Sequence, residues 1–172
     1  MVNKIDSRTL RDMSYGLYIL TSHDKDYLNG QIINSIIQVT SSPVRLAATI
    51  NKKNLTHELI SKSKVFAVST LDNSTPKSFF QLFGFMSGRD VDKLAKVRHK
   101  EGISGCPVIL ENALSAIEAS VFKEVDLGTH TVFIGNVIAS EVFGKGRSLT
   151  YRYYQEALNG RISENAPTYI PA

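Results

Sequence analysis

The stretch from Asn29 to His57 (NGQIINSIIQVTSSPVRLAATINKKNLTH) is rich in side chains that hydrogen-bond but has no evident pair of nucleophile and base. Its Asn, Gln, Ser and Thr residues stand between strand-forming residues, whereas acid–base catalysis needs titratable groups within reach of the substrate. The titratable residues Lys52, Lys53 and His57 stand at its end, where a helix is expected to begin. This composition is typical of a site that holds a hydrogen-bonding cofactor.

Two basic helix starts are expected in the chain. Unpaired N–H groups and positive partial charge gather at a helix N-terminus, so lysines beside it are unfavourable unless an anion binds there. The second start is expected at SGRDVDK, where Ser87 and Asp90 have capping-box spacing, although the box prefers Glu or Gln at the second position. Arg89 can grip two phosphate oxygens, and Lys93 follows one turn later. SGRD alone is more typical of a capped surface helix, but the two basic starts together favour an anionic ligand.

The elements that must position these residues are mostly extended. Strands are expected at residues 15–22, 31–40, 44–50, 65–71, 113–125 and 131–143, and short helices at 7–13, 54–62, 76–85 and 148–158. The last two strands flank DLGTH, a predicted hairpin turn. The pattern predicts a mainly β, antiparallel barrel with helices as connections. We expect one domain over residues 1–162 and a C-terminal tail over 163–172.

Composition excludes several classes of site and of location. The 172 residues contain one cysteine, Cys106, so no intrachain disulfide forms, and no Cys/His group has metal-site spacing. No apolar run is long enough to span a membrane, and no basic start precedes one, so a cytoplasmic protein is expected. The net charge of +4 suits an anionic ligand. A basic cluster is expected to be a solvated helix face and not a nucleic-acid patch: Lys93, Lys96, Arg98, His99 and Lys100.

In combination, several motifs resemble the flavin reductase-like family of FMN-binding split barrels. They are NG…NS…QVTSxP, then INKxNxTH, FG…SGRD…K, GCP and GxHTxFIG, over roughly residues 13–142. The branch that they resemble most contains flavoredoxin and the flavin domains of rubredoxin reductases. The resemblance implies a six-stranded antiparallel Greek-key split β-barrel with short flanking helices. It also implies a homodimer with FMN bound near the subunit interface.

The resemblance also assigns flavin-binding residues by position. The isoalloxazine ring would be faced by Asn34, Gln38, Val39 and Thr40. The ribityl chain and phosphate would be held by Asn51, Lys52, Asn54, Thr56 and His57. The phosphate end would be completed by Ser87, Gly88, Arg89 and Lys93. The family's histidine near the flavin corresponds to His130, which is assigned to catalysis, either steering the nicotinamide or tuning the reduced ring; a surface hairpin histidine is the alternative.

Two functions fit this resemblance. The first is an FMN-dependent oxidoreductase that passes electrons from NAD(P)H to free flavin, a ferric complex or a small redox protein. The alternative is an FMN-binding electron carrier, like flavoredoxin, with little NAD(P)H activity of its own. The chain has no paired CxxC motifs, so a rubredoxin partner is expected to be a separate protein. It has no Gly-rich Rossmann fingerprint, so NAD(P)H is expected to bind transiently over the flavin. A basic nucleic-acid-binding barrel is the remote third hypothesis.

Other reactive or aromatic residues are expected to be structural. Cys106 lacks a resolving partner and is predicted to be buried for packing. Phe79, Phe80, Phe83 and Phe85 have helical spacing, which favours core packing over ring stacking with a ligand.

Overall fold

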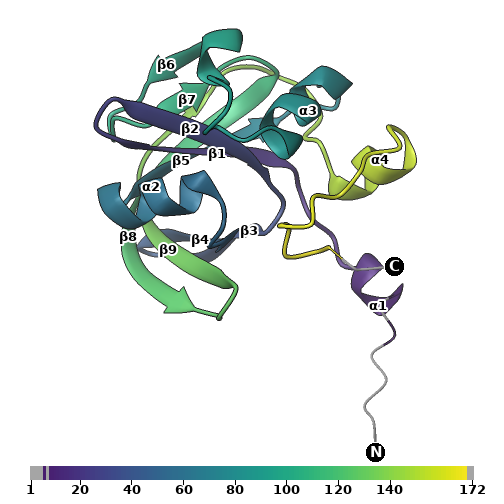
Figure 1. The fold of residues 1–172 in the computed structure, drawn as a ribbon, viewed down its shortest axis with the longest axis horizontal. Coiled ribbons are helices and arrows are strands. Elements are labelled where there is room, and N and C mark those ends of the chain that lie inside the picture. The colour runs from purple at the N-terminus through teal and green to yellow at the C-terminus, as the bar shows by residue number, and fades with distance from the viewer. Residues whose placement is uncertain (1–5, 7, 170–172) are drawn as a thin grey trace, which may run out of the picture.

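A computed structural model describes Asp6 and residues 8–169. Its seven-stranded antiparallel sheet has the order β2-β1-β5-β8-β9-β4-β3, and β6 and β7 form a separate hairpin (Figure 1). The strands are β1 (Tyr18–Asp24), β2 (Tyr27–Ile33), β3 (Ile36–Ser41), β4 (Val44–Asn51), β5 (Val65–Leu71), β6 (His99–Glu101), β7 (Pro107–Ile109), β8 (Ala113–Asp126) and β9 (His130–Val142). The helices are α1 (Arg8–Arg11), α2 (Leu55–Ser63), α3 (Lys77–Phe85), the 3₁₀ helix η1 (Leu94–Lys96) and α4 (Tyr151–Glu156). The mainly β, antiparallel class is confirmed.

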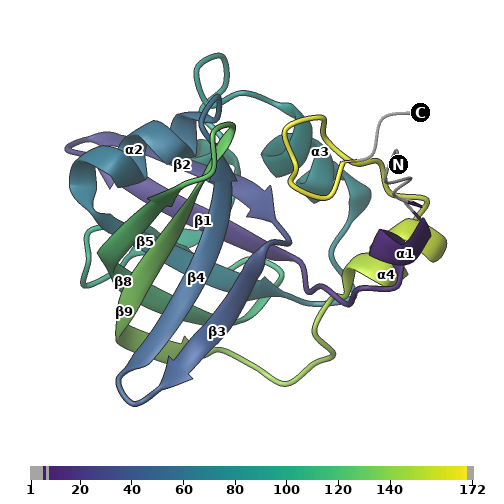
Figure 2. The ribbon, with the colours of Figure 1, turned by 90° about the horizontal axis from the view of Figure 1, so that it is seen from below.

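The main sheet curls around an apolar interior (Figure 2). Ile33 on β2 and Ile36 on β3, at the two ends of the strand order, belong to one buried cluster with Phe66 on β5 and Phe133 on β9. Residues at opposite edges of a flat sheet would lie too far apart to share a core. The sheet is therefore a barrel that stays open between β2 and β3, and Ile60 of α2 packs into the same cluster.

The stretch expected as one strand over residues 31–40 is two strands. It breaks at Asn34 and Ser35, because β2 pairs with β1 whereas β3 pairs with β4. The Ser35 hydroxyl stabilises this break between β2 and β3, because it donates to the Thr49 carbonyl at 2.8 Å. The main sheet thus has seven strands and not six. Asn34, the first residue of the break between β2 and β3, lies beside the candidate site.

A second apolar cluster lies outside the barrel, where α3 and α4 pack over β1. It contains Ile19 of β1, Phe79 and Phe83 of α3, and Tyr154 of α4. The predicted core packing of the phenylalanines is confirmed for Phe79, Phe80 and Phe83, whereas Phe85 is exposed. Because α3 is anchored in this way, the chain that follows it has a defined position beside β2.

The second predicted helix start, at SGRDVDK, is wrong. Ser87 Oγ accepts from the Arg89 N–H at 3.1 Å, and the Asp90 N–H donates to the Ser87 carbonyl, so the chain forms a turn. The short η1 follows, and Asp92 Oδ1 accepts from the Leu94 N–H at 3.0 Å. Side-chain hydrogen bonds of this kind compete with helix formation.

The basic cluster also differs from the expected solvated helix face. Lys93 is buried, whereas Lys96 lies on η1 and is exposed. His99 and Lys100 belong to β6 and not to a helix. Among the described residues, no helix combines the length and apolar character needed to cross a membrane.

Candidate functional site

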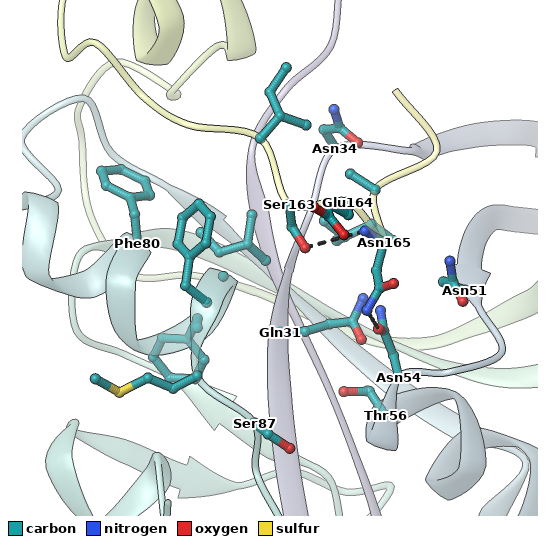
Figure 3. Close-up of a pocket in the computed structure, with 18 of the residues that line it drawn as sticks. Gln31, Asn34, Asn51, Asn54, Thr56, Phe80, Ser87, Ser163, Glu164 and Asn165 are labelled. Atoms are coloured by element: carbon teal, nitrogen blue, oxygen red, sulfur yellow. Dashed lines mark hydrogen bonds between the residues drawn. The ribbon is translucent and has the colours of Figure 1, made fainter. Parts of the chain in front are cut away.

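A cleft of about 580 Å³ lies between β2, the start of α2 and the chain that follows α3. Its volume is within the range of about 300–1,000 Å³ that is typical of ligand pockets. Figure 3 shows Asn51, Asn54 and Thr56 on one side, Phe80 on the other and Gln31 between them. The cleft therefore has one hydrogen-bonding side and one aromatic side.

The start of α2 supplies the hydrogen-bonding side. Asn54 precedes α2 in an extended conformation, and its side chain makes no capping hydrogen bond to the helix. The turn before it is held by Asn51, whose Oδ1 accepts from the Lys53 N–H at 3.0 Å. An N-terminus without a side-chain cap leaves helix N–H groups available for an anion. Lys53 also lines the cleft and adds positive charge there.

Lys93 is a buried cation in this cleft. Its residue is 5% exposed, and its Nζ donates to the Gly30 carbonyl at 3.0 Å. No carboxylate within the described ranges pairs with it, and burial lowers its pKa to about 8. A desolvated ammonium without a counter-charge favours binding of an anion. Arg89 also lines the cleft and forms an ion pair with Glu58, so its guanidinium is held beside α2.

The C-terminal segment, residues 161–168, lies along the cleft and hydrogen-bonds to its polar side. Asn165 Nδ2 donates to Asn54 Oδ1 at 3.2 Å, and Asn34 Nδ2 donates to Thr168 Oγ1 at 2.8 Å (Figure 3 labels three of these residues). Most of this segment belongs to the predicted C-terminal tail over residues 163–172. Its polar residues and prolines carry no local signal of a binding role, so only the folded chain reveals these contacts. The domain boundary at residue 162 stays a prediction.

The cleft brings together part of the predicted cofactor-binding set. The members that line it are Asn34, Asn51, Asn54, Thr56, Ser87, Gly88, Arg89 and Lys93. Lining residues outside the predicted set include Gln31, Lys53, Phe80 and most of the C-terminal segment. The alternation of Asn29, Gln31 and Ile33 on β2 was the available signal for Gln31, because these side chains share one side of a strand.

Three predicted ring contacts do not line the cleft. Gln38, Val39 and Thr40 lie on β3, where the register with β4 shifts between Gln38 and Thr40. Gln38 Nε2 donates to the Thr40 carbonyl at 3.2 Å, and the Thr40 hydroxyl donates to the Pro43 carbonyl. Val39 is exposed. Their contact with the flavin ring stays a prediction.

Lys52 and His57 also do not line the cleft. Lys52 Nζ pairs with Asp126 Oδ1 at 2.6 Å. His57 Nε2 lies 2.8 Å from Thr131 Oγ1, and its ring meets Phe133 edge-on. Burial, followed by the charge of Lys52, lowers the pKa of His57. The imidazole is therefore neutral at pH 7, which does not favour a role as a phosphate-binding cation.

His130, the predicted catalytic residue, lies beside the C-terminal segment. Its Nε2 is 3.4 Å from the Asn165 carbonyl oxygen, and its Nδ1 is 2.8 Å from Thr129 Oγ1. It does not line the cleft, and its catalytic role stays a prediction. The described part of the chain has no group of three or more His, Cys, Asp or Glu that could hold a metal ion.

The protein is a curled antiparallel barrel, and its cleft joins amide side chains to a basic helix start that has no side-chain cap. These features define the class of proteins that hold a phosphate-bearing cofactor. Within that class, this chain is a member of the flavin reductase-like family, because residues 10–160 match the flavin reductase like domain. The family resemblance noted from the motifs is thereby confirmed.

Relatives cover nearly the whole chain. It is 39% identical over 166 residues to the ferric-chelate reductase (NAD(P)H) of Archaeoglobus fulgidus, a match that covers 96% of this chain and 98% of that protein. It is 41% identical over 165 residues to the high molecular weight rubredoxin of Moorella thermoacetica, covering 96% of this chain and 72% of that protein. Among solved structures, the NADH:FAD oxidoreductase of Streptomyces globisporus superposes with a TM-score of 0.76 at 25% identity, over 87% of this chain and 91% of that one.

Proposed function

We propose that this protein is an FMN-dependent oxidoreductase that takes electrons from NAD(P)H and passes them to free flavin, a ferric complex or a small redox protein. One observation carries the proposal: a cleft that combines amide side chains, an aromatic side and a buried ammonium without a carboxylate partner among the described residues occurs in a chain of this family. The near full-length similarity to a protein named ferric-chelate reductase (NAD(P)H) supports the same activity.

The residues of the cleft fit FMN. The phosphate of FMN carries up to two negative charges at neutral pH, and three cationic residues line the cleft together with the start of α2: Lys53, Arg89 and Lys93. The polar edge of a flavin ring needs donors and acceptors, which Gln31 and Asn54 provide. Phe85 and Met86, which line the cleft and are 50% and 45% exposed, offer an apolar surface to a flat ring.

The protein has to supply little chemistry of its own. Bound FMN supplies the redox step, because its ring accepts a hydride and releases electrons. The residues of this chain bind the phosphate, orient the ring and keep the nicotinamide aligned above it. No base is needed for hydride transfer, in agreement with a neutral His57 outside the cleft. Replacing His130 by alanine is therefore expected to slow flavin reduction without abolishing it.

Anaerobic mixing of the FMN-loaded protein with NADH and with NADPH tests the proposal. The visible flavin absorbance is expected to bleach with at least one nucleotide, and addition of flavin or a ferric chelate should restore it. If both nucleotides leave the flavin oxidised while dithionite bleaches it, the electron-carrier alternative replaces the reductase. A protein that binds no flavin at all would overturn both.

We also propose a homodimer built on the outward face of β3, β4, β9 and β8. Ile37 on β3, Phe122 on β8 and Ile138 on β9 are 64%, 54% and 44% exposed. The Arg45 guanidinium on β4 lies 4.0 Å from the centroid of the Phe122 ring, so side chains from separated strands meet on one face. Large exposed apolar residues grouped in this way mark an interaction surface.

Light scattering tests the dimer. The expected mass is twice the 19.0 kDa of one chain. Phe122→Asp and Ile37→Asp should give monomers, because an isologous interface would bury the new charge twice. Ile103→Asp is the matched control, since Ile103 is highly exposed but lies on the loop between β6 and β7. A monomeric wild-type protein with FMN bound would refute the dimer.

The proposal includes a partner and a location. The similarity to a protein named high molecular weight rubredoxin supports a small redox protein of the rubredoxin type as one electron acceptor. A cytoplasmic location is supported by the only cysteine, Cys106, which is a buried free thiol. Rapid anaerobic reoxidation of the reduced protein by purified rubredoxin, monitored by flavin absorbance, tests this acceptor. Reoxidation no faster than with an unrelated iron–sulfur protein would remove it.

A further inference from the structure

The Gln31 side chain has an unusual position in the cleft. It extends from β2 into the cleft, and Figure 3 shows its head group directed toward Asn54 and Asn165. Its Oε1 is buried and has no hydrogen-bond partner among the described residues, and its Nε2 makes no hydrogen bond there either. Neither end of this carboxamide is thus paired with a described residue, and the buried end is the oxygen.

Other amides of the cleft do have partners. Asn29 Nδ2 donates to Thr56 Oγ1 at 2.8 Å, and Asn165 Nδ2 donates to Asn54 Oδ1 at 3.2 Å. The unpaired state is therefore particular to Gln31 and not general to this surface. Burying an amide without a partner destabilises a protein, and such groups in native structures require an explanation. A ligand that completes the hydrogen bonds is the explanation that the position in a cleft favours.

We propose that Gln31 is a specificity-determining residue that pairs with an amide-type edge of the bound ligand, an N–H group beside a carbonyl oxygen. A carboxamide both donates and accepts, so its complement must also carry both functions side by side. This inference rests on the proposed function, in which two groups have such an edge. They are the pyrimidine edge of the flavin ring and the carboxamide of the nicotinamide.

Gln31→Leu keeps the approximate size of the side chain and removes both polar ends. The variant is expected to weaken binding of the ligand that carries the edge by about three- to tenfold. Its melting temperature without ligand is expected to equal or exceed that of the wild type, because an unpaired buried amide oxygen has been removed. Gln81→Leu, at an exposed position of α3, is the matched control and should change neither quantity. A structural role for Gln31 predicts the opposite, a lower melting temperature with unchanged binding.

Two ligand analogues identify the edge that Gln31 binds. N3-methyl-FMN lacks the N–H of the flavin edge, and the reduced 3-acetylpyridine analogue of NADH lacks the carboxamide N–H. Wild-type protein should bind one of them about three- to tenfold more weakly than its parent ligand, and Gln31→Leu should bind that pair equally. The analogue that shows this difference names the ligand group.

Two results overturn the assignment, and they are distinguishable. If wild type binds FMN and reacts with NAD(P)H, but each analogue loses the same factor in wild type and in Gln31→Leu, the assignment of Gln31 falls and the proposed function stands. If wild type binds neither FMN nor nicotinamide nucleotide, the proposed function falls and this assignment falls with it.

Discussion

Replacing Lys93 by methionine removes a buried positive charge while keeping the length and the apolar stem of the side chain. Burial lowers the pKa of Lys93 from 10.5 to about 8. At about 1.36 kcal/mol per pH unit, this corresponds to roughly 3 kcal/mol of cost for keeping the folded, ligand-free protein protonated at pH 7. Removing the Lys93 charge also removes its hydrogen bond to the Gly30 carbonyl, and this loss offsets about 1 kcal/mol of the gain in stability. Ligand-free Lys93→Met should therefore be more stable than wild type by roughly 2 kcal/mol at pH 7.

The pH dependence has a definite sign. The unfolded chain holds the Lys93 proton up to a pKa near 10.5, whereas the folded protein releases it near 8. Between these two pH values the unfolded state binds more protons than the folded state. The wild-type free energy of unfolding therefore rises with increasing pH, relative to that of Lys93→Met. Urea unfolding at about pH 7 and about pH 10 should show the gap closing.

FMN binding should change in the opposite direction. The loss of one partly buried, charge-assisted contact with the phosphate is expected to weaken FMN binding by about 1.5–3 kcal/mol, or roughly 10- to 150-fold. Riboflavin, which lacks the phosphate, should bind both proteins equally. Fluorescence titrations at one salt concentration measure both ligands. Lys96→Met, at an exposed position of η1, is the control. Equal FMN affinity in Lys93→Met and wild type would refute the role of Lys93 in binding the phosphate.

Three further outcomes are expected. Arg89→Ala should weaken FMN binding by about 1.5–3 kcal/mol. Lys52→Ala should leave FMN binding unchanged, because Lys52 pairs with Asp126 outside the cleft. Equal losses of FMN affinity in calorimetric titrations of the two variants would contradict this assignment. Because the pKa of His57 lies below its usual value of 6.5, the wild-type free energy of unfolding should fall more steeply than that of His57→Gln as the pH drops below 6.5, and parallel urea-unfolding curves would argue against this. Burial raises the pKa of the Cys106 thiol to about 11, so alkylation at neutral pH should require unfolding, and fast labelling of the folded protein would show an accessible thiol.

Local sequence patterns were sufficient for most of the long elements and for the family. Period-two alternation and β-branched residues identify strands, and the DLGTH turn between β8 and β9 depends only on residues close in sequence. The predicted helices at 54–62 and 76–85 correspond to α2 and α3 within a few residues. The motif order identified the flavin reductase-like family, which the domain match over residues 10–160 confirms. The break at Asn34 was not visible, since β2 and β3 are equally rich in strand formers.

The composition of the site was decided by tertiary structure. Lys52 and Lys53 are adjacent and chemically identical, yet Lys52 turns to Asp126 and Lys53 lines the cleft, because the turn before α2 orients successive side chains differently. Lys93 was expected on a helix face, but packing beside β2 buried it, and that burial lowers its pKa. The contact of Asn165 with Asn54 joins residues 111 positions apart. Long-range packing determines which polar groups stay unpaired, so a local pattern selects candidate ligands but does not show which of them face the cleft.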